Sequence, residues 1–420
     1  MMPIFDFRNW LVLFALNFFI VQANAQEGLS NARSMSMAGA YTALAAGVES
    51  PIWNPANLGL RNKNAYTINL LSVGVSLNNN GFTYDQYLKY NGSYLNEEDK
   101  QDILDSIPET GLTGEVDAEL QALGFSFGTF AIIFSGFEFS DLNVSKDAAE
   151  LFLYGNQFGR NYDFRDSRAD GSGFASVAVS KGFRLKMASM HEFAVGVTGR
   201  YIHGIANGRL RELSGSLTTD IDGLHGSGKL VFESSLGGDG FGLDFGVAAR
   251  PTRAWTLSMS VANVYSNINW KTDAKRHEFG FTADSVTVQK IGEAGFDSVF
   301  VDSDSTYEIE GFNSHLPRQL RFGIARTGRN FTFAVNLTQG FEESVSSTKS
   351  PRVSVGAELR IIPLLPLRTG VALGGKRGLT TSAGFGLDFG LLVWDFALAV
   401  QDASFSGKEV SLAFSWMLRL

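Results

Sequence analysis

Alternation between apolar residues and small or polar residues is the dominant pattern of this chain. Phe385, Leu387 and Phe389 are each separated from the next by a glycine or an aspartate. Successive side chains of a β-strand point to opposite faces, so a period of two predicts a strand with one apolar face. The same period runs through residues 241–247, 331–338, 392–400 and 410–418. The pattern therefore predicts an all-β protein.

Fourteen segments carry this alternation and are predicted to be strands. They cover residues 65–77, 119–128, 129–140, 172–183, 191–206, 240–250, 254–264, 317–327, 330–340, 351–362, 367–376, 379–390, 392–402 and 408–419. A soluble β-sandwich also alternates, but strands of this length match the roughly 9–11 residues of a tilted membrane-crossing strand. We therefore expect a fourteen-stranded antiparallel transmembrane β-barrel over residues 61–420, and fourteen is an even number, as is usual for such barrels.

The predicted connections alternate in length, which orients the barrel. Those after every second strand are short, whereas those after the first, third, fifth and seventh strands are long. Short turns face the periplasm in bacterial barrels and long loops face outward. Two external loops are predicted to be partly helical, from Asn96 to Pro108 and from Ser145 to Gly155. The longest, from Tyr265 to Leu316, is predicted to be a solvated acidic loop with a hairpin made by residues 285–290 and 298–302.

The first residues indicate export. An apolar run from Trp10 to Val21 precedes Ala23-Asn24-Ala25, which predicts a signal peptide over residues 1–25. An N-terminal membrane anchor is the alternative, although the run is short for a helix that spans a bilayer. The chain has no cysteine, which excludes disulfides, thiolate metal sites and lipid attachment through Cys.

Residues 26–60 differ from the rest of the mature chain. Alanine, glycine and serine dominate between Ser34 and Gly47, and no strand alternation is present. Asn54-Pro55 is a turn signal, because proline lacks an N–H and restricts the residue before it. We expect this segment to form short helices that pack inside a crowded space as a plug.

Two motifs in this segment carry a family resemblance. They are Ala32-Arg33-Ser34-Met35-Ser36-Met37-Ala38-Gly39-Ala40-Tyr41 and Trp53-Asn54-Pro55-Ala56-Asn57-Leu58. The chain resembles the long-chain fatty acid transporter (FadL) superfamily of outer-membrane barrels, and within it an uncharacterised branch. The resemblance implies a hatch that plugs a fourteen-stranded barrel in the outer membrane of a diderm bacterium. The related PorV and PorQ proteins belong to a secretion system, so the resemblance leaves transport and secretion both open.

Recognisable enzyme and metal motifs are missing from the sequence. None of the five histidines lies in a nucleophile motif, and Asp302-Ser303-Asp304 lacks the glycine and distal glutamate of a calcium loop. The net charge of −8 comes without a basic cluster, which argues against nucleic-acid binding. We therefore expect no catalysis, no cofactor, no metal and no nucleic-acid partner.

Charged residues on the polar face of the strands are the candidate ligand-binding residues. By alternation the lumen-facing charges are Asp244, Arg250, Arg321, Glu358, Arg360, Arg368, Asp388 and Asp395. Charges inside a barrel must pair or meet water. One interpretation is an ion-pair network that anchors the plug, and the other is a path for an amphipathic acid whose carboxylate meets arginine.

Two functions follow. The chain is expected to be a channel for hydrophobic or amphipathic molecules such as fatty acids. The alternative is a surface anchor or secretion-associated barrel that does not transport and binds protein partners through its external loops. In both cases outer-membrane lipid surrounds the barrel.

Overall fold

A computed structural model describes residues 28–294, 300–344, 347–401 and 408–420. The expected signal peptide, residues 1–25, lies outside the described residues.

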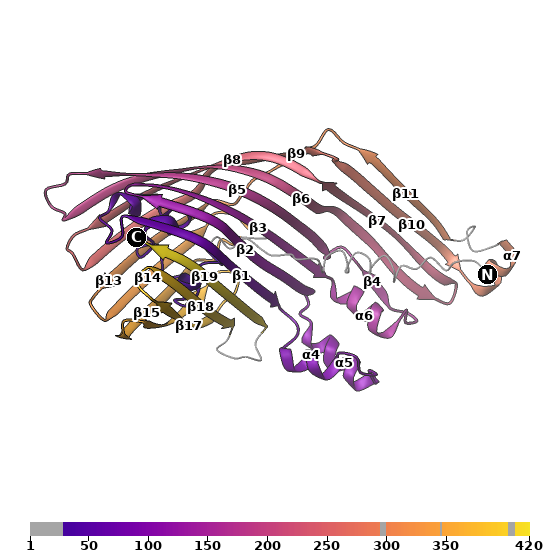
Figure 1. The fold of residues 1–420 in the computed structure, drawn as a ribbon. Coiled ribbons are helices and arrows are strands. Elements are labelled where there is room, and N and C mark those ends of the chain that lie inside the picture. Colours follow the sequence, from indigo (N-terminus) through magenta and orange to yellow (C-terminus); the bar gives the residue numbers. More distant parts are fainter. Residues whose placement is uncertain (1–27, 295–299, 345–346, 402–407) are drawn as a thin grey trace.

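A closed ring of fourteen antiparallel strands forms the body of the described chain (Figure 1). The ring strands are β1 (Tyr66–Asn79), β2 (Leu112–Phe127), β3 (Phe130–Val144), β5 (Arg168–Leu185), β6 (Glu192–Asp220), β8 (Gly237–Arg250), β9 (Trp255–Thr272), β13 (Gln319–Thr327), β14 (Phe331–Gly340), β15 (Arg352–Ile362), β16 (Leu365–Gly374), β17 (Thr380–Asp388), β18 (Leu392–Gln401) and β19 (Glu409–Arg419). Each strand pairs with its neighbour, and β1 pairs with β19 to close the ring, for example Val73 opposite Phe414. Every strand predicted from the sequence overlaps one of these, so the fold class is confirmed.

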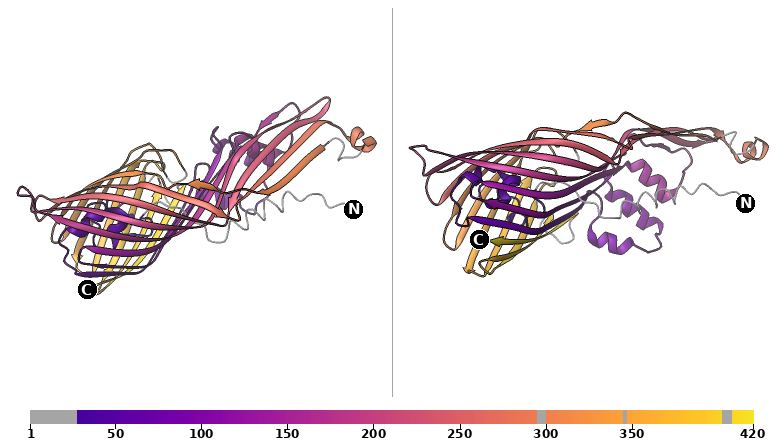
Figure 2. Two further views of the ribbon diagram at one scale, coloured as in Figure 1. Left: turned by 90° about the horizontal axis from the view of Figure 1, so that it is seen from above. Right: turned by 45° about the horizontal axis from the view of Figure 1, so that its top comes forward.

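One wall of the barrel continues far beyond the ring (Figure 2). Strand β6 extends to Asp220, and its outer part pairs with β7 (Gly223–Ser235), which pairs with β10 (Lys275–Val286) and then β11 (Phe300–Glu308). Two short strands are added to this wall. Strand β4 (Asn161–Asp163) pairs with β6, and strand β12 (Phe312–Ser314) pairs with β9. We call the outer part of β6 together with β7, β10 and β11 the extension.

The extension corrects two expectations. The segment between Tyr265 and Leu316 is not mainly a solvated loop, because it contains the end of β9 and the strands β10 and β11. The hairpin expected at residues 285–290 and 298–302 was also wrong in its bounds. The paired strands cover residues 275–286 and 300–308, and helix α7 (Val288–Ala294) follows the first of them. These strands pair in a sheet outside the ring, and Lys275, Asp302 and Asp304 interrupt the face that carries Phe279 and Phe281.

The helical loops agree better with the sequence. Helix α5 (Glu97–Ser106) begins after Asn96, whose side chain accepts a hydrogen bond from the Asp99 backbone N–H. Helix α6 (Lys146–Tyr154) begins after Ser145 and ends at Gly155, whose φ of 73° is a left-handed conformation that glycine adopts readily. Helix α4 (Tyr84–Tyr90) was not expected.

The two faces of the ring differ as the alternation predicts. Large apolar side chains such as Phe245, Phe322 and Leu412 are exposed on the outside, at 49%, 41% and 57%. On the inside, Ser258, Asn336 and Ser411 are buried. A surface that is apolar outside and polar inside suits a barrel surrounded by hydrocarbon.

Residues 28–60 fill the lumen, as the helices inside the barrel show in Figure 1. The segment forms α2 (Ala32–Met35), η1 (Gly47–Glu49), α3 (Ser50–Trp53) and η2 (Pro55–Gly59), nearly all buried. We call this segment the plug.

Glycines on the inner wall make room for the plug. At nine described positions on nine different strands, an added Cβ would lie within 3.0 Å of a plug atom: Gly74, Gly124, Gly182, Gly196, Gly246, Gly323, Gly356, Gly370 and Gly384. Real Cβ atoms do not approach other atoms so closely, and at Gly196 the obstacle is the backbone of Pro55 and Ala56. The high glycine content of the chain therefore has a structural reason in the contact between wall and plug.

Gly196→Ala is expected to displace the plug, whereas Gly199→Ala on the same strand is expected to be neutral. A Cβ at Gly199 meets nothing within 4 Å. Overpacking of a close contact typically costs about 1–3 kcal/mol. Thermal unfolding in detergent should show a lower midpoint for Gly196→Ala alone, and equal midpoints for the two variants would contradict this role of the wall glycines.

Candidate functional site

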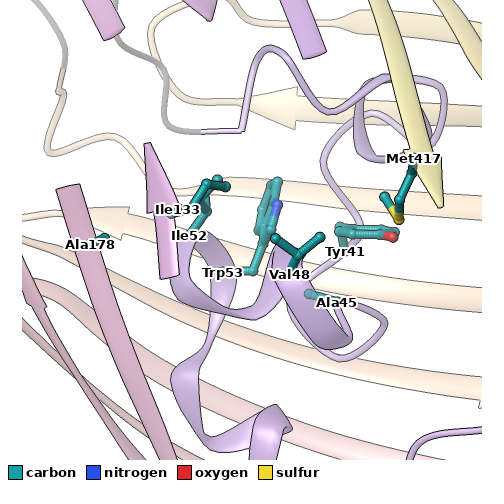
Figure 3. Packing of buried hydrophobic residues seen from close by; sticks show 8 residues of the cluster. All are labelled: Tyr41, Ala45, Val48, Ile52, Trp53, Ile133, Ala178 and Met417. Atoms are coloured by element: carbon teal, nitrogen blue, oxygen red, sulfur yellow. The ribbon is translucent and has the colours of Figure 1, made fainter. Parts of the chain in front are cut away.

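The plug has its own small core. Tyr41 packs edge-on against Trp53 with 5.6 Å between ring centroids, and Val48 and Ile52 complete the cluster with Ile133 of the wall (Figure 3). Glu49 is buried and accepts hydrogen bonds from Asn31 Nδ2 and from the Tyr41 hydroxyl, both at 2.7 Å. These contacts join the first helix of the plug to the segment around Glu49.

The Trp53-Asn54-Pro55-Ala56 motif binds the plug to strands β8 and β9 through hydrogen bonds. Asn54 Oδ1 accepts a hydrogen bond from the Ala56 backbone N–H at 2.9 Å, which forms the turn that proline favours. Asn54 Nδ2 donates to Ser258 Oγ at 2.6 Å and to the carbonyls of Val247 and Met259 at 3.0 and 3.1 Å. A short side chain that is both donor and acceptor is needed at this position.

Trp53 is fixed from two directions. Ser260 Oγ donates to its carbonyl at 2.7 Å, and the Arg321 guanidinium lies 5.3 Å from its ring centroid. Ala56 is fully buried against Ala194 and Ala248. The motif that carries the family resemblance is thus the part of the plug seated against the wall strands β6, β8 and β9.

A network of ion pairs holds the plug at the opposite side of the ring. Arg33 of the plug pairs with Glu358 at 3.0 Å, and Glu358 also pairs with Arg368 at 2.7 Å and Arg360 at 2.8 Å. The network continues through Arg368 to Asp395 at 2.6 Å, and from Arg360 and Arg419 to Asp388 at 3.0 and 3.1 Å. A buried carboxylate is tolerated when it is paired and hydrogen-bonded in this way.

The eight charges selected from the sequence do not form one site. The structure brings together Glu358, Arg360, Arg368, Asp388 and Asp395. The other three lie apart. Asp244 pairs with Arg200 at 3.1 Å, Arg250 pairs with Glu192 at 3.0 Å, and Arg321 Nη1 donates to the Ile52 carbonyl at 2.5 Å. This geometry favours the anchoring interpretation for most of the selected charges.

A second closure lies at the mouth from which the helical loops and the extension project. The turn between β16 and β17, Gly374–Gly378, reaches across the mouth to the acidic inner faces of other strands, and we call it the strap. Lys376 pairs with Asp141 at 3.0 Å and also with Glu115. Arg377 pairs with Glu409 at 2.7 Å and also with Asp117.

Sequence reasoning missed the strap, although two signals were present. Glu115, Asp117 and Glu119 recur with a period of two at the start of β2, and Lys376-Arg377 lies between glycines. Gly374, Gly375 and Gly378 have φ values of 86°, 70° and 65°, which other residues rarely adopt. Only the closed ring brings the acidic stripe and the basic turn together.

A cavity of about 110 Å³ lies between the plug and the strap, and we call it the chamber. Ala38, Gly39 and Trp53 of the plug line one side, and Gly375, Lys376 and Arg377 of the strap line another. The remaining lining is polar and consists of Glu115, Asp117, Gln319, Arg321, Thr338, Gly340, Ser347, Thr348, Ser350, Arg352 and Ser354. The chamber is therefore a space with a mixed polar and apolar lining between the plug and the strap.

Neither a metal-binding group nor a membrane-spanning helix is found within the described ranges. No group of three or more His, Asp or Glu side chains among these residues is arranged to hold a metal ion. No helix in this part of the chain is both long and apolar enough to cross a bilayer.

Glu358→Gln is expected to loosen the plug. The change leaves Arg33 without its ion-pair partner, and removal of one partner of a buried pair costs on the order of 3 kcal/mol. Trypsin should then cleave after Arg33, which the barrel otherwise protects, and mass spectrometry would detect the fragment. Glu212→Gln, in the exposed Glu212–Lys229 pair of the extension, is the control. Equal protection of Arg33 in both variants would contradict the anchoring role.

Removal of the strap ion pairs is expected to open the chamber. The chain has no cysteine, so Ser354→Cys places a single thiol at a buried position in the chamber lining. Lys376→Ala combined with Arg377→Ala should raise the rate of maleimide labelling at this thiol several-fold. The same pair of changes should not alter labelling of Asn91→Cys, which is exposed on a loop. An unchanged rate at position 354 would show that the strap does not close the mouth.

Comparisons with known proteins agree with this fold. The toluene transporter TbuX of Ralstonia pickettii has a TM-score of 0.53 and 13% identity, over 94% of this chain and 99% of that chain. The CymD monoaromatic hydrocarbon channel gives 0.53 and 14%, over 95% and 99%. The toluene transporter TodX of P. putida gives 0.50 and 11%, over 92% and 97%. At such identities the likeness shows the fold alone, and the fourteen-stranded barrel expected from the sequence is confirmed.

The sequence was also compared with curated proteins and with family profiles. No curated protein matches it significantly. The profile of one family matches residues 55–397, which is more than half of the chain. The protein therefore belongs to the family described as "Family of unknown function (DUF5723)".

Proposed function

We propose that this protein is an outer-membrane channel for hydrophobic or amphipathic small molecules such as fatty acids, with residues 26–60 as its hatch. One observation carries the proposal: the lumen of a closed barrel is blocked by a segment of the same chain, held there by non-covalent contacts alone. The apolar exterior of the ring supports its placement in a membrane. The fold shared with hydrocarbon channels supports the class of substrate.

The contacts of the plug are suited to rearrangement. The plug joins no strand of the wall, so its movement breaks no β-ladder. Its contacts with the wall include single hydrogen bonds from backbone N–H groups to wall side chains, as from Ala32 N to Ser415 Oγ and from Val48 N to Thr67 Oγ1, both at 2.9 Å. Each of these hydrogen bonds contributes about 0.5–1.5 kcal/mol, so partial release is accessible to a ligand that binds the open state better.

The ion-pair network also lowers the cost of opening. When Arg33 leaves, Glu358 retains Arg360 and Arg368 as partners. A buried carboxylate that keeps two guanidiniums does not incur the full cost of an unpaired charge. The buried carboxylate of the wall therefore keeps ion-pair partners while the plug moves.

A second function is favoured by the extension. Across β6, β7 and β10 one face carries Leu213, Leu230, Phe279 and Phe281, and Phe279 is 37% exposed. Glu233, on the other face, is held by Arg276 and Arg209; although burial raises its pKa, their hydrogen bonds bring that pKa below its usual value. A rigid, partly apolar sheet outside the ring is a surface for a protein partner, so we retain the anchor or secretion-associated role as the alternative.

Uptake into proteoliposomes tests the channel. The purified protein is expected to speed the entry of toluene or radiolabelled oleate relative to empty liposomes, and removal of residues 26–60 should raise ion conductance in planar bilayers. Equal uptake with and without protein would refute transport of these substrates. Unchanged conductance after the deletion would refute the hatch, and binding of a protein to the extension without uptake would favour the alternative.

A further inference from the structure

The extension ends in a strand that has one free edge. Strand β11 pairs with β10 from Phe300 to Glu308 without a bulge. Strand β12, which follows it in the chain, pairs with β9 instead, so β11 forms the margin of the extension (Figure 1). Every residue from Val301 to Glu308 is exposed. No described segment therefore covers this edge or either face of β11.

The opposite edge of the extension is covered. Strand β4 pairs with the outer part of β6. Beside it, the backbone N–H groups of Gly159 and Phe164 donate to the carbonyls of Thr219 and Gly215 at 2.7 and 3.1 Å. Sheets commonly protect an edge with such a covering segment, with a bulge or with a proline. Strand β11 has neither a bulge nor a proline, so its edge can accept another strand.

The backbone groups that point to the free edge can be identified. The Ile309 N–H donates to the Ala274 carbonyl at 2.9 Å, in the register that pairs β11 with β10. Alternate residues of an antiparallel strand bond to the same neighbour, so the odd-numbered residues of β11 bond to β10. The backbone N–H and C=O groups that point away from β10 are those of Asp302, Asp304, Thr306 and Glu308. An extended peptide can pair with such groups as an added strand.

Two carboxylates on this edge determine which peptide fits. Asp302 and Asp304 lie opposite Phe281 and Phe279 of β10, so both point to the same face of the sheet. Neither makes an ion pair with any residue that the structure describes. A side chain opposite either of them on an added strand would have its Cβ within about 4.5–5.5 Å. Lysine or arginine is attracted at that distance and an acidic residue is repelled.

The same carboxylates argue against a second copy of this chain as the occupant. If β11 paired with its own copy in an antiparallel register centred on Ser303, Asp302 of one copy would lie opposite Asp304 of the other. A register centred on Asp304 would place two Asp304 side chains opposite each other. Like charges that lie directly opposite destabilise a strand pair. The edge therefore selects a basic strand over itself.

We propose that the free edge of β11 binds an extended segment of a partner protein as an added strand, with basic residues two positions apart opposite Asp302 and Asp304. The inference rests on the alternative, partner-binding role of the extension and names the class of partner. It also gives a role to Asp302-Ser303-Asp304, because a period of two places both carboxylates on one face of a strand. The nine residues of β11 offer an edge about 30 Å long.

Fluorescence anisotropy with the full-length protein in detergent micelles tests the edge. The probe is a labelled nine-residue peptide with lysine at every second position and threonine or valine between. A control peptide of the same composition has its four lysines as two adjacent pairs separated by two residues, so that no two lysines lie two positions apart. It should bind about threefold more weakly, since one of the two charge pairs is lost. A peptide with glutamate in place of every lysine should not bind.

Charge variants assign the binding to the two carboxylates. Asp302→Asn combined with Asp304→Asn should weaken binding of the alternating lysine peptide about fivefold, because both charge pairs are lost. Glu98→Gln combined with Asp105→Asn makes the same change of net charge at exposed positions on α5 and should bind the peptide normally.

A backbone variant assigns the binding to the edge. Thr306→Pro removes an N–H that points to the free edge, while the hydrogen bonds between β11 and β10 do not use it. Thr306→Ala keeps this N–H and is the matched control, because both changes remove the contact of the Thr306 hydroxyl with His277 Nδ1 at 2.9 Å. The proline variant should bind the lysine peptide at least about tenfold more weakly than the alanine variant, since it loses a hydrogen bond and its ring obstructs the added strand.

Several outcomes would overturn the proposal. These are no binding of the alternating lysine peptide, equal affinity for the two lysine peptides, or equal affinity of Thr306→Pro and Thr306→Ala. A protein partner that is lost by Phe279→Ser and retained by Thr306→Pro would keep the partner-binding role of the extension and overturn the edge site. Liposome uptake is a separate measurement, so a failure of transport leaves the edge site standing.

Discussion

The structure depends on one constraint, the polar space that a closed ring of fourteen strands encloses. Closure satisfies the backbone of every ring strand through its neighbours, which leaves only side chains to face the interior. A segment placed in that interior cannot extend the sheet, so its backbone groups bind one another in short helices and turns or bind wall side chains. Thr67, Glu119 and Ser415 are such partners, because each accepts a backbone N–H of the plug. The inner face is consequently rich in small polar residues where the plug lies beside it.

The two sides of the wall hold the plug by different physical means. Near β8 and β9 the contact is close packing, in which Asn54 lies against Gly246 and no larger residue fits. Near β15 and β16 the contact combines packing of Met37 against Gly356 and Gly370 with the ion pair between Arg33 and Glu358. Close packing does not depend on the ionic strength of the medium. The ion pair does, and Glu358 has other arginine partners when Arg33 leaves. The charged side is therefore the natural place for release to begin.

The plug and the strap close the lumen in series, and the chamber between them has properties of its own. A hydrocarbon that crossed from the mouth would meet charged and hydroxyl groups before it reached the apolar core around Tyr41 and Trp53. An amphipathic molecule matches this order better than a purely apolar one, because its polar head has partners in the chamber.

Local patterns in the sequence determined the ring but not the lumen. A period of two identifies a strand wherever one face meets hydrocarbon, which is why all fourteen ring strands and the caps at Asn96 and Ser145 were predictable. Strands β10 and β11 were missed because charged residues such as Asp302 and Asp304 interrupt the apolar alternation outside the ring. Alternation also identified Glu358, Arg368 and Asp395 as inward-facing, because the face to which a side chain points depends only on its position in its own strand. The pairing of Glu358 with Arg33 and the closure by Lys376 and Arg377 join residues that are far apart in the chain. Only the closed ring decides those distances, so the tertiary structure alone defined the site.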